Sequence, residues 1–234
     1  MIRGGLFVYV EAVLAPLIPS HAPCRAHLEI MGLLSRMLRG TRWERLALPI
    51  LETDRLAIAP LQADMAEEVR RLTDDPAITG AVDFLPERFE LADARGLIRA
   101  ASSGRDVFLG LVEHEDRRLI GIVGAHLRAL EAIEIGYWIG GSARGRGYGA
   151  EGVEAVVRAL AEGYPRRAIV AECRPENVAS WRMLHKLGFR PTGDDGKRPG
   201  RQLMVWDIRD APQGRLAAPG TIASGVAARP DGAR

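Results

Sequence analysis

The stretch Arg144-Gly145-Arg146-Gly147-Tyr148-Gly149 places three glycines and two arginines between an apolar strand pattern and a helical one. Glycines let a backbone approach an anion closely, and the start of a helix offers unpaired N–H groups with a partial positive charge. Arginine adds a cationic fork that suits phosphate. The stretch therefore predicts a pyrophosphate-binding turn, and the alternative is a flexible turn with two solvated arginines.

The residues on either side of this turn carry clear structural periods. Residues 132–139 (AIEIGYWI) have the pattern of a strand, and the helix predicted over 147–163 repeats its apolar residues at the spacing of one buried stripe. Pro165 ends that helix. The pattern then predicts a strand over 168–172, a helix over 177–187 and a last strand over 203–208 that closes the sheet.

The upstream segment adds more strands and two helices. We expect a strand over 55–61, helices over 63–73 and 91–102, and a hairpin formed by 107–113 and 119–127. Strands that alternate with helices in this order predict an α/β fold with a mixed sheet and helices on both faces. The segments 75–90 and 193–201 are expected to line a substrate cleft.

A second motif follows the glycine-rich turn. Residues 175–180 (PENVAS) lead into 181–189 (WRMLHKLGF), where Asn177 can cap a helix and Gly188 can end it. The pair RxxGxG and NxxSxxxLxKxGF closely resembles the two signature motifs of the GNAT superfamily of acyltransferases. Residues 51–56 (LETDRL) and 134–139 (EIGYWI) resemble its branch of ribosomal-protein serine and alanine N-acetyltransferases. The resemblance covers residues 51 to 208.

The resemblance implies a fold, a co-substrate and a reaction. It implies a single domain over 51–209 with a mostly antiparallel central sheet that splays at the acyl-CoA site. The enzyme would transfer an acetyl group directly from acetyl-CoA to a primary amine, either a protein N-terminal α-amine or a small-molecule amine. By resemblance, the acetyl-CoA contacts would come from Tyr137, Trp138, Ile139, Arg144, Gly145, Arg146, Gly147, Tyr148, Gly149, Ala150, Asn177 and Ser180.

Candidate catalytic residues follow from what amine acetylation requires. A carboxylate near the amine can accept its proton, and Glu134 is the first candidate because its strand leads into the glycine-rich turn. Glu172 is the second candidate. Many GNAT members carry a tyrosine as the acid that protonates the leaving thiolate, and His185 stands at that position here. Ser180 and His185 are therefore both candidates for the acid.

Two other functional classes compete with this interpretation. Gly145-x-Gly147-x-x-Ala150 formally matches the GxGxxA fingerprint of a dinucleotide-binding oxidoreductase. However, five residues separate the strand from Gly145, and too few residues follow the turn for a second nucleotide-binding half. A non-catalytic module that binds acetyl-CoA is the other alternative, because a fold and a ligand site do not guarantee chemistry.

Composition limits the possible partners. The chain has 32 basic and 30 acidic residues, a net charge of +2. This balance argues against nucleic acid or an anionic membrane as a partner. Its two cysteines form no metal-binding motif, so we expect no metal cofactor. We expect a cytoplasmic protein, a monomer or a homodimer.

The two ends of the chain lack the signals of a packed domain. Residues 1–50 form an N-terminal extension with one possible short helix after Met31, and residues 1–30 are expected to be dispensable. The apolar stretch from Leu6 to Ile18 is interrupted by a glutamate and prolines, which argues against a secretion signal. Residues 210–234 are rich in small residues and are predicted to be disordered.

Overall fold

A computed structural model describes residues 45–101, 104–128 and 132–207, all within one compact unit that begins at Arg45. Three predictions concern residues outside these ranges: a helix after Met31, the dispensability of residues 1–30 and the disorder of the tail over 210–234.

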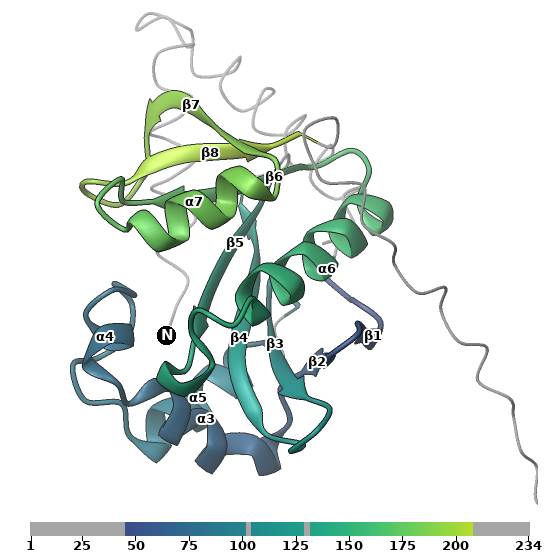
Figure 1. The fold of residues 1–234 in the computed structure, drawn as a ribbon, viewed down its shortest axis with the longest axis vertical. Helices are drawn as coiled ribbons and strands as arrows, with labels where there is room; N and C mark the ends of the chain where they lie inside the picture. The colour runs from purple at the N-terminus through teal and green to yellow at the C-terminus, as the bar shows by residue number, and fades with distance from the viewer. Residues whose placement is uncertain (1–44, 102–103, 129–131, 208–234) are drawn as a thin grey trace, which may run out of the picture. The chain divides into compact units, whose positions relative to one another are not determined.

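The described residues form one eight-stranded sheet with helices packed on it (Figure 1). The strands are β1 (Leu51–Glu52), β2 (Leu56–Pro60), β3 (Asp106–Glu113), β4 (Leu119–Arg128), β5 (Ala132–Ile139), β6 (Ala168–Cys173), β7 (Phe189–Asp195) and β8 (Gln202–Trp206). Their order is β1-β2-β3-β4-β5-β6-β8-β7, and every neighbouring pair is antiparallel except β5 and β6. The predicted mixed and mostly antiparallel sheet is confirmed.

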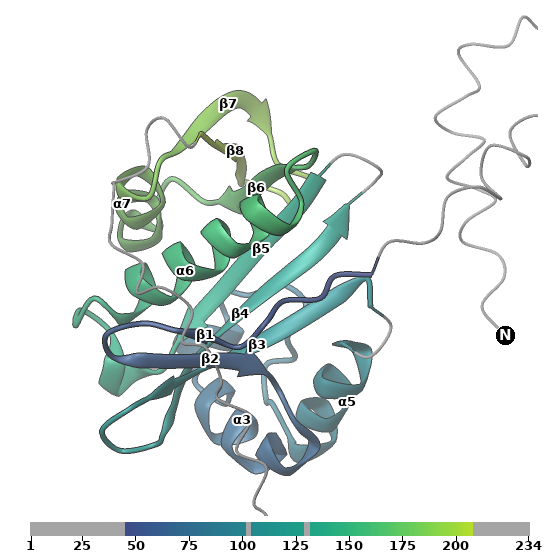
Figure 2. The same ribbon diagram turned by 90° about the vertical axis from the view of Figure 1, so that its right-hand side faces the viewer.

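Helices cover both faces of this sheet, as predicted (Figure 2). On one face lies α6 (Tyr148–Gly163), with α7 (Val178–Lys186) beside it; on the other lie α3 (Ala66–Thr73) and α5 (Leu91–Ala101), and the short α4 (Pro76–Thr79) follows α3. The apolar stripe of α6 is buried in the first core through Val153, Val156 and Leu160. A second core on the opposite face includes Val69 and Leu97.

The C-terminal edge of the sheet differs from the prediction. The strand expected to close the sheet is β8, but β8 lies between β6 and β7, and β7 forms the edge. The sequence of β7, FRPTGDD, contains a proline, a glycine and two aspartates and has only one buried residue. An exposed edge strand tolerates such residues, which explains why it carries no apolar pattern.

Residues before β1 also pack on the domain. Leu46 is 5% exposed and belongs to the core beneath α6. The hydroxyl oxygen of Tyr164, just after α6, accepts a hydrogen bond of 2.7 Å from the N–H of Ala47 and donates one of 3.1 Å to the carbonyl of Arg45. The packed chain therefore starts several residues before Leu51, where the family resemblance begins.

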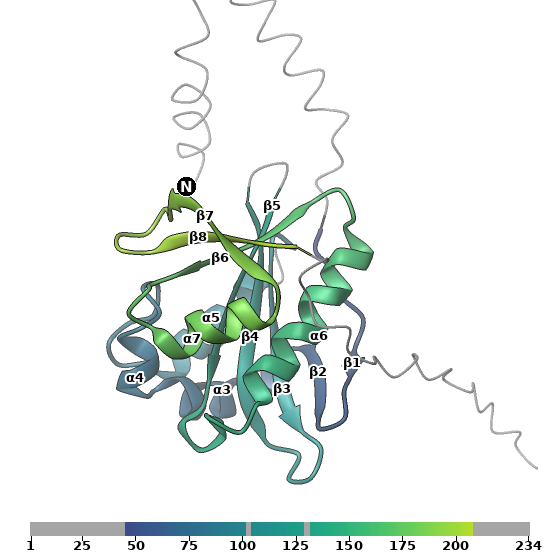
Figure 3. The ribbon, with the colours of Figure 1, turned by 45° about the horizontal axis from the view of Figure 1, so that its top comes forward.

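The sheet opens between its two parallel strands. β5 and β6 pair from Ala132–Ala168 to Ile135–Ala171 and no further, whereas β5 continues to pair with β4 up to Ile139. β6 instead follows β8, and Figure 3 shows β6 and β8 turning away from the direction of β4 and β5. The β5 edge over residues 136–139 therefore faces a gap, and the predicted splay is present.

Candidate active site

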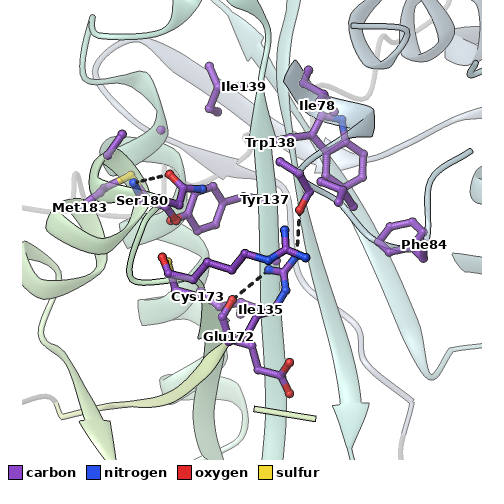
Figure 4. Close-up of a pocket in the computed structure, with 18 of the residues that line it drawn as sticks. Ile78, Phe84, Ile135, Tyr137, Trp138, Ile139, Glu172, Cys173, Ser180 and Met183 are labelled. Atoms are coloured by element: carbon purple, nitrogen blue, oxygen red, sulfur yellow. Dashed lines mark hydrogen bonds between the residues drawn. The ribbon is translucent and has the colours of Figure 1, made fainter. Parts of the chain in front are cut away.

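A cavity of about 1090 Å³ occupies this gap and reaches both faces of the sheet. Figure 4 shows Tyr137 and Ser180 on one side of β5, and Trp138 and Phe84 on the other. Alternation along the strand explains the division, since successive side chains point to opposite faces. The candidate residues that line the cavity are Glu134, Tyr137, Trp138, Ile139, Arg144, Gly145, Gly147, Gly149, Ala150, Glu172, Asn177 and Ser180.

The glycine-rich turn lies at the end of the cavity next to α6. Gly145 and Gly147 have φ angles of 73° and 86°, in the left-handed region that favours glycine. α6 begins directly after Gly147, and the N–H groups of its first turn have no partner within the helix. Gly149 and Ala150 from that turn line the cavity. The turn therefore has the backbone geometry of an anion site.

The two arginines of the turn have different environments. Arg144 lines the cavity, but its Nη2 contacts Asp75 Oδ2 at 2.8 Å and its Nε donates to the carbonyl of Ile139 at 2.9 Å. Arg146 lies outside the cavity: its guanidinium stacks 4.9 Å from the ring centre of Tyr148. The buried Tyr148 side chain also points away from the cavity, toward Glu113. The side chains of Arg146 and Tyr148 therefore do not line the cavity.

Helix α7 brings Ser180 into the cavity. Asn177 caps this helix, its Oδ1 accepting a hydrogen bond of 3.2 Å from the Ser180 N–H. The Ser180 hydroxyl lies 2.5 Å from the Tyr137 hydroxyl, from a strand 43 residues earlier. Burial raises the pKa of Tyr137 well above its ordinary value, an effect that the hydrogen bond with Ser180 only partly opposes. The tyrosine therefore stays protonated beside the Ser180 hydroxyl.

His185 lies elsewhere on the same helix. Five positions along an α-helix correspond to a rotation of about 140°, so Ser180 and His185 point in different directions. The His185 ring packs against Trp181 with 5.3 Å between ring centres, and the residue does not line the cavity. The sequence position that many family members give to a tyrosine thus lies outside the cavity here.

Glu134 and Glu172 are both buried in the cavity wall and share one arginine. Arg198, from the loop between β7 and β8, contacts both carboxylates, with 3.0 Å between its Nε and Glu172 Oε2. Glu134 also accepts a hydrogen bond of 2.8 Å from Arg128 Nε. Both glutamates are thus engaged in ion pairs at the cavity wall.

The two segments expected to line a cleft, 75–90 and 193–201, both contribute residues to the cavity wall. Asp83, after α4, binds Arg174, which directly follows β6, at 2.7 Å, and Arg201, in the loop between β7 and β8, at 2.9 Å. An aromatic wall lies beside them. It consists of Phe84, Phe108 and Trp138, whose ring centres are 6.2–6.3 Å apart.

A histidine–aspartate pair also lines the cavity, and the sequence pattern did not reveal it. His126 Nδ1 on β4 lies 2.7 Å from Asp106 Oδ1 on β3, and the two residues are cross-strand partners. The hydrogen bond from His126 lowers the pKa of the Asp106 carboxyl, against the opposing effect of partial burial. The only available signal is a histidine in the otherwise apolar strand LIGIVGAHL.

The described part of the chain has neither a cluster of metal ligands nor a helix that could span a membrane. Over residues 45–101, 104–128 and 132–207, no group of three or more His, Cys, Asp or Glu side chains is placed to hold a metal ion. In the same ranges, no helix has the length and apolar composition needed to cross a membrane.

Comparison with known proteins agrees with this geometry. Residues 55–190 match the family model described as an acetyltransferase (GNAT) domain. An uncharacterised N-acetyltransferase of Bacillus licheniformis, p20, is 26% identical over 165 residues, which is 67% of this chain and 92% of the relative.

Solved structures share the fold. A GNAT-family acetyltransferase from Bacillus anthracis has a TM-score of 0.59 at 22% identity, over 67% of this chain and 97% of its own. RimJ from Mycobacterium smegmatis, solved in complex with CoA-disulfide, has a TM-score of 0.56 at 21% identity, over 68% of this chain and 84% of its own. The family match covers more than half of the chain, and the chain therefore belongs to the GNAT family as an acetyl-CoA-dependent acyltransferase.

Proposed function

We propose that this enzyme transfers the acetyl group of acetyl-CoA directly to a primary amine, and that the two substrates meet in the gap between β5 and β6. The observation that carries the proposal is that one continuous cavity crosses the sheet between β5 and β6. It joins the start of α6 and the Tyr137–Ser180 pair on one face to Glu134 and the aromatic wall on the other.

The residues on the α6 face fit acetyl-CoA. The first-turn N–H groups of α6, next to Gly145 and Gly147, would hold the pyrophosphate, and the β5 edge over residues 136–138, which β6 leaves, would pair with the pantetheine arm. Bound acetyl-CoA supplies an electrophilic carbonyl carbon and a thiolate leaving group. RimJ from Mycobacterium smegmatis, which has the same fold, was solved with CoA-disulfide, and this supports the assignment.

Ser180 is the proposed acid for the departing thiolate. Its hydroxyl lines the cavity and lies 2.5 Å from the Tyr137 hydroxyl, which is kept protonated by burial and can return the proton to Ser180. His185 is not favoured because its ring packs against Trp181 outside the cavity.

The opposite face is the proposed amine site. The buried carboxylates of Glu134 and Glu172 line it, each paired with a guanidinium group. Phe84 is 53% exposed although it is a large apolar residue, so the aromatic wall favours an amine attached to an apolar or aromatic group. Because one cavity joins the two faces, the amine can reach the thioester carbonyl through the gap, and the transfer is proposed to be direct.

An acceptor screen tests this function. The full-length protein is incubated with acetyl-CoA and separate amines, namely Ser- and Ala-initiated tetrapeptides, 2-phenylethylamine, spermidine and an aminoglycoside. Thiol release and the mass of the acetylated product are both recorded. We expect amine-dependent thiol release with at least one member and a product heavier by one acetyl group. If no amine stimulates thiol release, the proposal is contradicted. A complete lack of thiol release would then support a binding module, and release without any amine would indicate thioester hydrolysis.

A further inference from the structure

We infer that His126 is the general base that takes the proton from the acceptor amine, and that Asp106 is its positioning residue. The inference rests on the proposed function and assigns the proton acceptor that this function requires. It replaces the carboxylates that the sequence suggested for this role.

The first argument is the state of the imidazole. Asp106 Oδ1 lies 2.7 Å from His126 Nδ1, which places the donated proton on Nδ1. In that tautomer Nε2 carries a lone pair and is the proton acceptor. A carboxylate that holds a histidine in this way also stabilises the imidazolium that forms after proton transfer.

The second argument is the position of Nε2. The ring lies along β4 over Gly124, and a Cβ added to Gly124 would lie only 2.7 Å from His126 Nε2. A side chain at position 124 would therefore collide with the imidazole in this position. Because Gly124 has no side chain, His126 Nε2 can lie next to the cross-strand pair Gly124–Gly136, which neighbours the pair His126–Glu134 on the same face.

The third argument is the open space next to Nε2. A Cβ added to Gly136 would meet nothing within 4 Å, and Gly136 lines the cavity. Directly opposed residues on antiparallel strands have Cβ positions about 4.5–5.5 Å apart, so this space lies within reach of Nε2. Gly136 is also the first β5 residue beyond the last pair with β6, Ile135–Ala171. An amine over Gly136 would thus lie at the gap that the thioester must enter.

The charged groups around His126 and Asp106 favour His126 over Glu134 as the proton acceptor. Asp106 on β3 faces the imidazole, Arg128 on β4 binds both Asp106 and Glu134, and Arg198 binds Glu134 from the far side. The lining residues contributed by α5 are the apolar Leu97 and Ala100. Glu134 is thus held by two guanidinium groups, while His126 has one carboxylate partner.

The proton and electron changes balance. The lone pair of the neutral amine forms the C–N bond with the acetyl carbon, and the C–S bond breaks with its electron pair left on sulfur. The nitrogen proton goes to His126 Nε2, and the thiolate takes a proton from the Ser180 hydroxyl. The products are the acetylated amine and free CoA, and the enzyme regains its starting state by exchanging one proton from His126 and one to Ser180 with solvent.

Histidine variants of the full-length protein test the inference with the panel amine that the wild type acetylates fastest. For His126→Ala, and for His126→Gln, which keeps more of the side-chain volume, we expect kcat to fall by about 10²–10⁴-fold. The affinity for acetyl-CoA, measured by calorimetry, should not change. Added imidazole should restore activity to His126→Ala, because the missing base is then supplied from solution. Asp106→Asn should lower kcat without rescue by imidazole.

His114→Ala provides the matched control, because His114 is an exposed histidine at the end of β3 outside the cavity. It should behave like the wild type. Full activity in both His126 variants, or loss of activity that imidazole does not restore, would overturn the assignment of His126 and leave the proposed function standing. If the wild type acetylates no panel amine, the proposed function fails first and the assignment fails with it.

Discussion

The glycine-rich turn yields the sharpest test of the acetyl-CoA site, namely a comparison of Gly147→Val with Gly193→Val. The two glycines have φ angles of 86° and 90°, so the backbone of a valine is strained at both; a Cβ at position 147 would also lie 3.3 Å from the flexible Arg55 side chain. A non-glycine residue held in this region costs about 1–3 kcal/mol of folding free energy. Only Gly147 borders the cavity and the first turn of α6; Gly193 lies in β7, outside it.

The two variants should therefore lose similar stability but differ in ligand binding. Relief of the strain at position 147 turns the adjacent N–H groups away from the phosphates, and each charge-assisted hydrogen bond lost costs about 1.5–3 kcal/mol. One such loss weakens the affinity for CoA by roughly 10- to 150-fold. Thermal unfolding measures the stability, and isothermal titration calorimetry with CoA measures the affinity. Equal CoA affinity in the two variants would refute the assignment of this turn to the pyrophosphate.

Three further changes test other parts of the structure. Ser180→Ala should lower kcat by about 10²-fold as a lost general acid, whereas His185→Ala should retain wild-type kcat, and the opposite order in steady-state kinetics would reverse the assignment. Leu46→Ala should lower the free energy of unfolding by about 2–5 kcal/mol in urea titrations, because this side chain is buried in the core beneath α6; a negligible change would place residues before β1 outside the folded domain. Asp106 has a lowered pKa in the folded state, so its ionisation stabilises the fold above pH of about 4 and this contribution is lost as pH falls through the folded-state value. The stability deficit of Asp106→Asn should therefore shrink on acidification, and a deficit that is constant with pH would show that the carboxylate charge does not contribute.

The sequence by itself determined most of the secondary structure and the glycine-rich turn before α6. These features depend on neighbouring residues: the apolar period of α6, the alternation in β5 and the glycines at the start of α6 are all visible within short windows. The strand β7 was missed because an edge strand carries few buried side chains and therefore no apolar period. The family resemblance also supplied the mostly antiparallel sheet and its splay, which composition and periodicity alone leave open.

Only the tertiary structure decided which side chains meet in the cavity. Tyr137 and Ser180 are 43 residues apart in sequence, and their hydroxyls meet because α7 packs beside the end of β5 that β6 leaves. The pairing of Arg198 with the two glutamates likewise depends on the path of the loop between β7 and β8. The contact of His126 with Asp106 depends on the register of β3 against β4, and a shift of one residue would place the two side chains on opposite faces. Period and motif identify the face of an element, but register and packing between distant segments determine which charged groups are paired and which one is left to accept a proton.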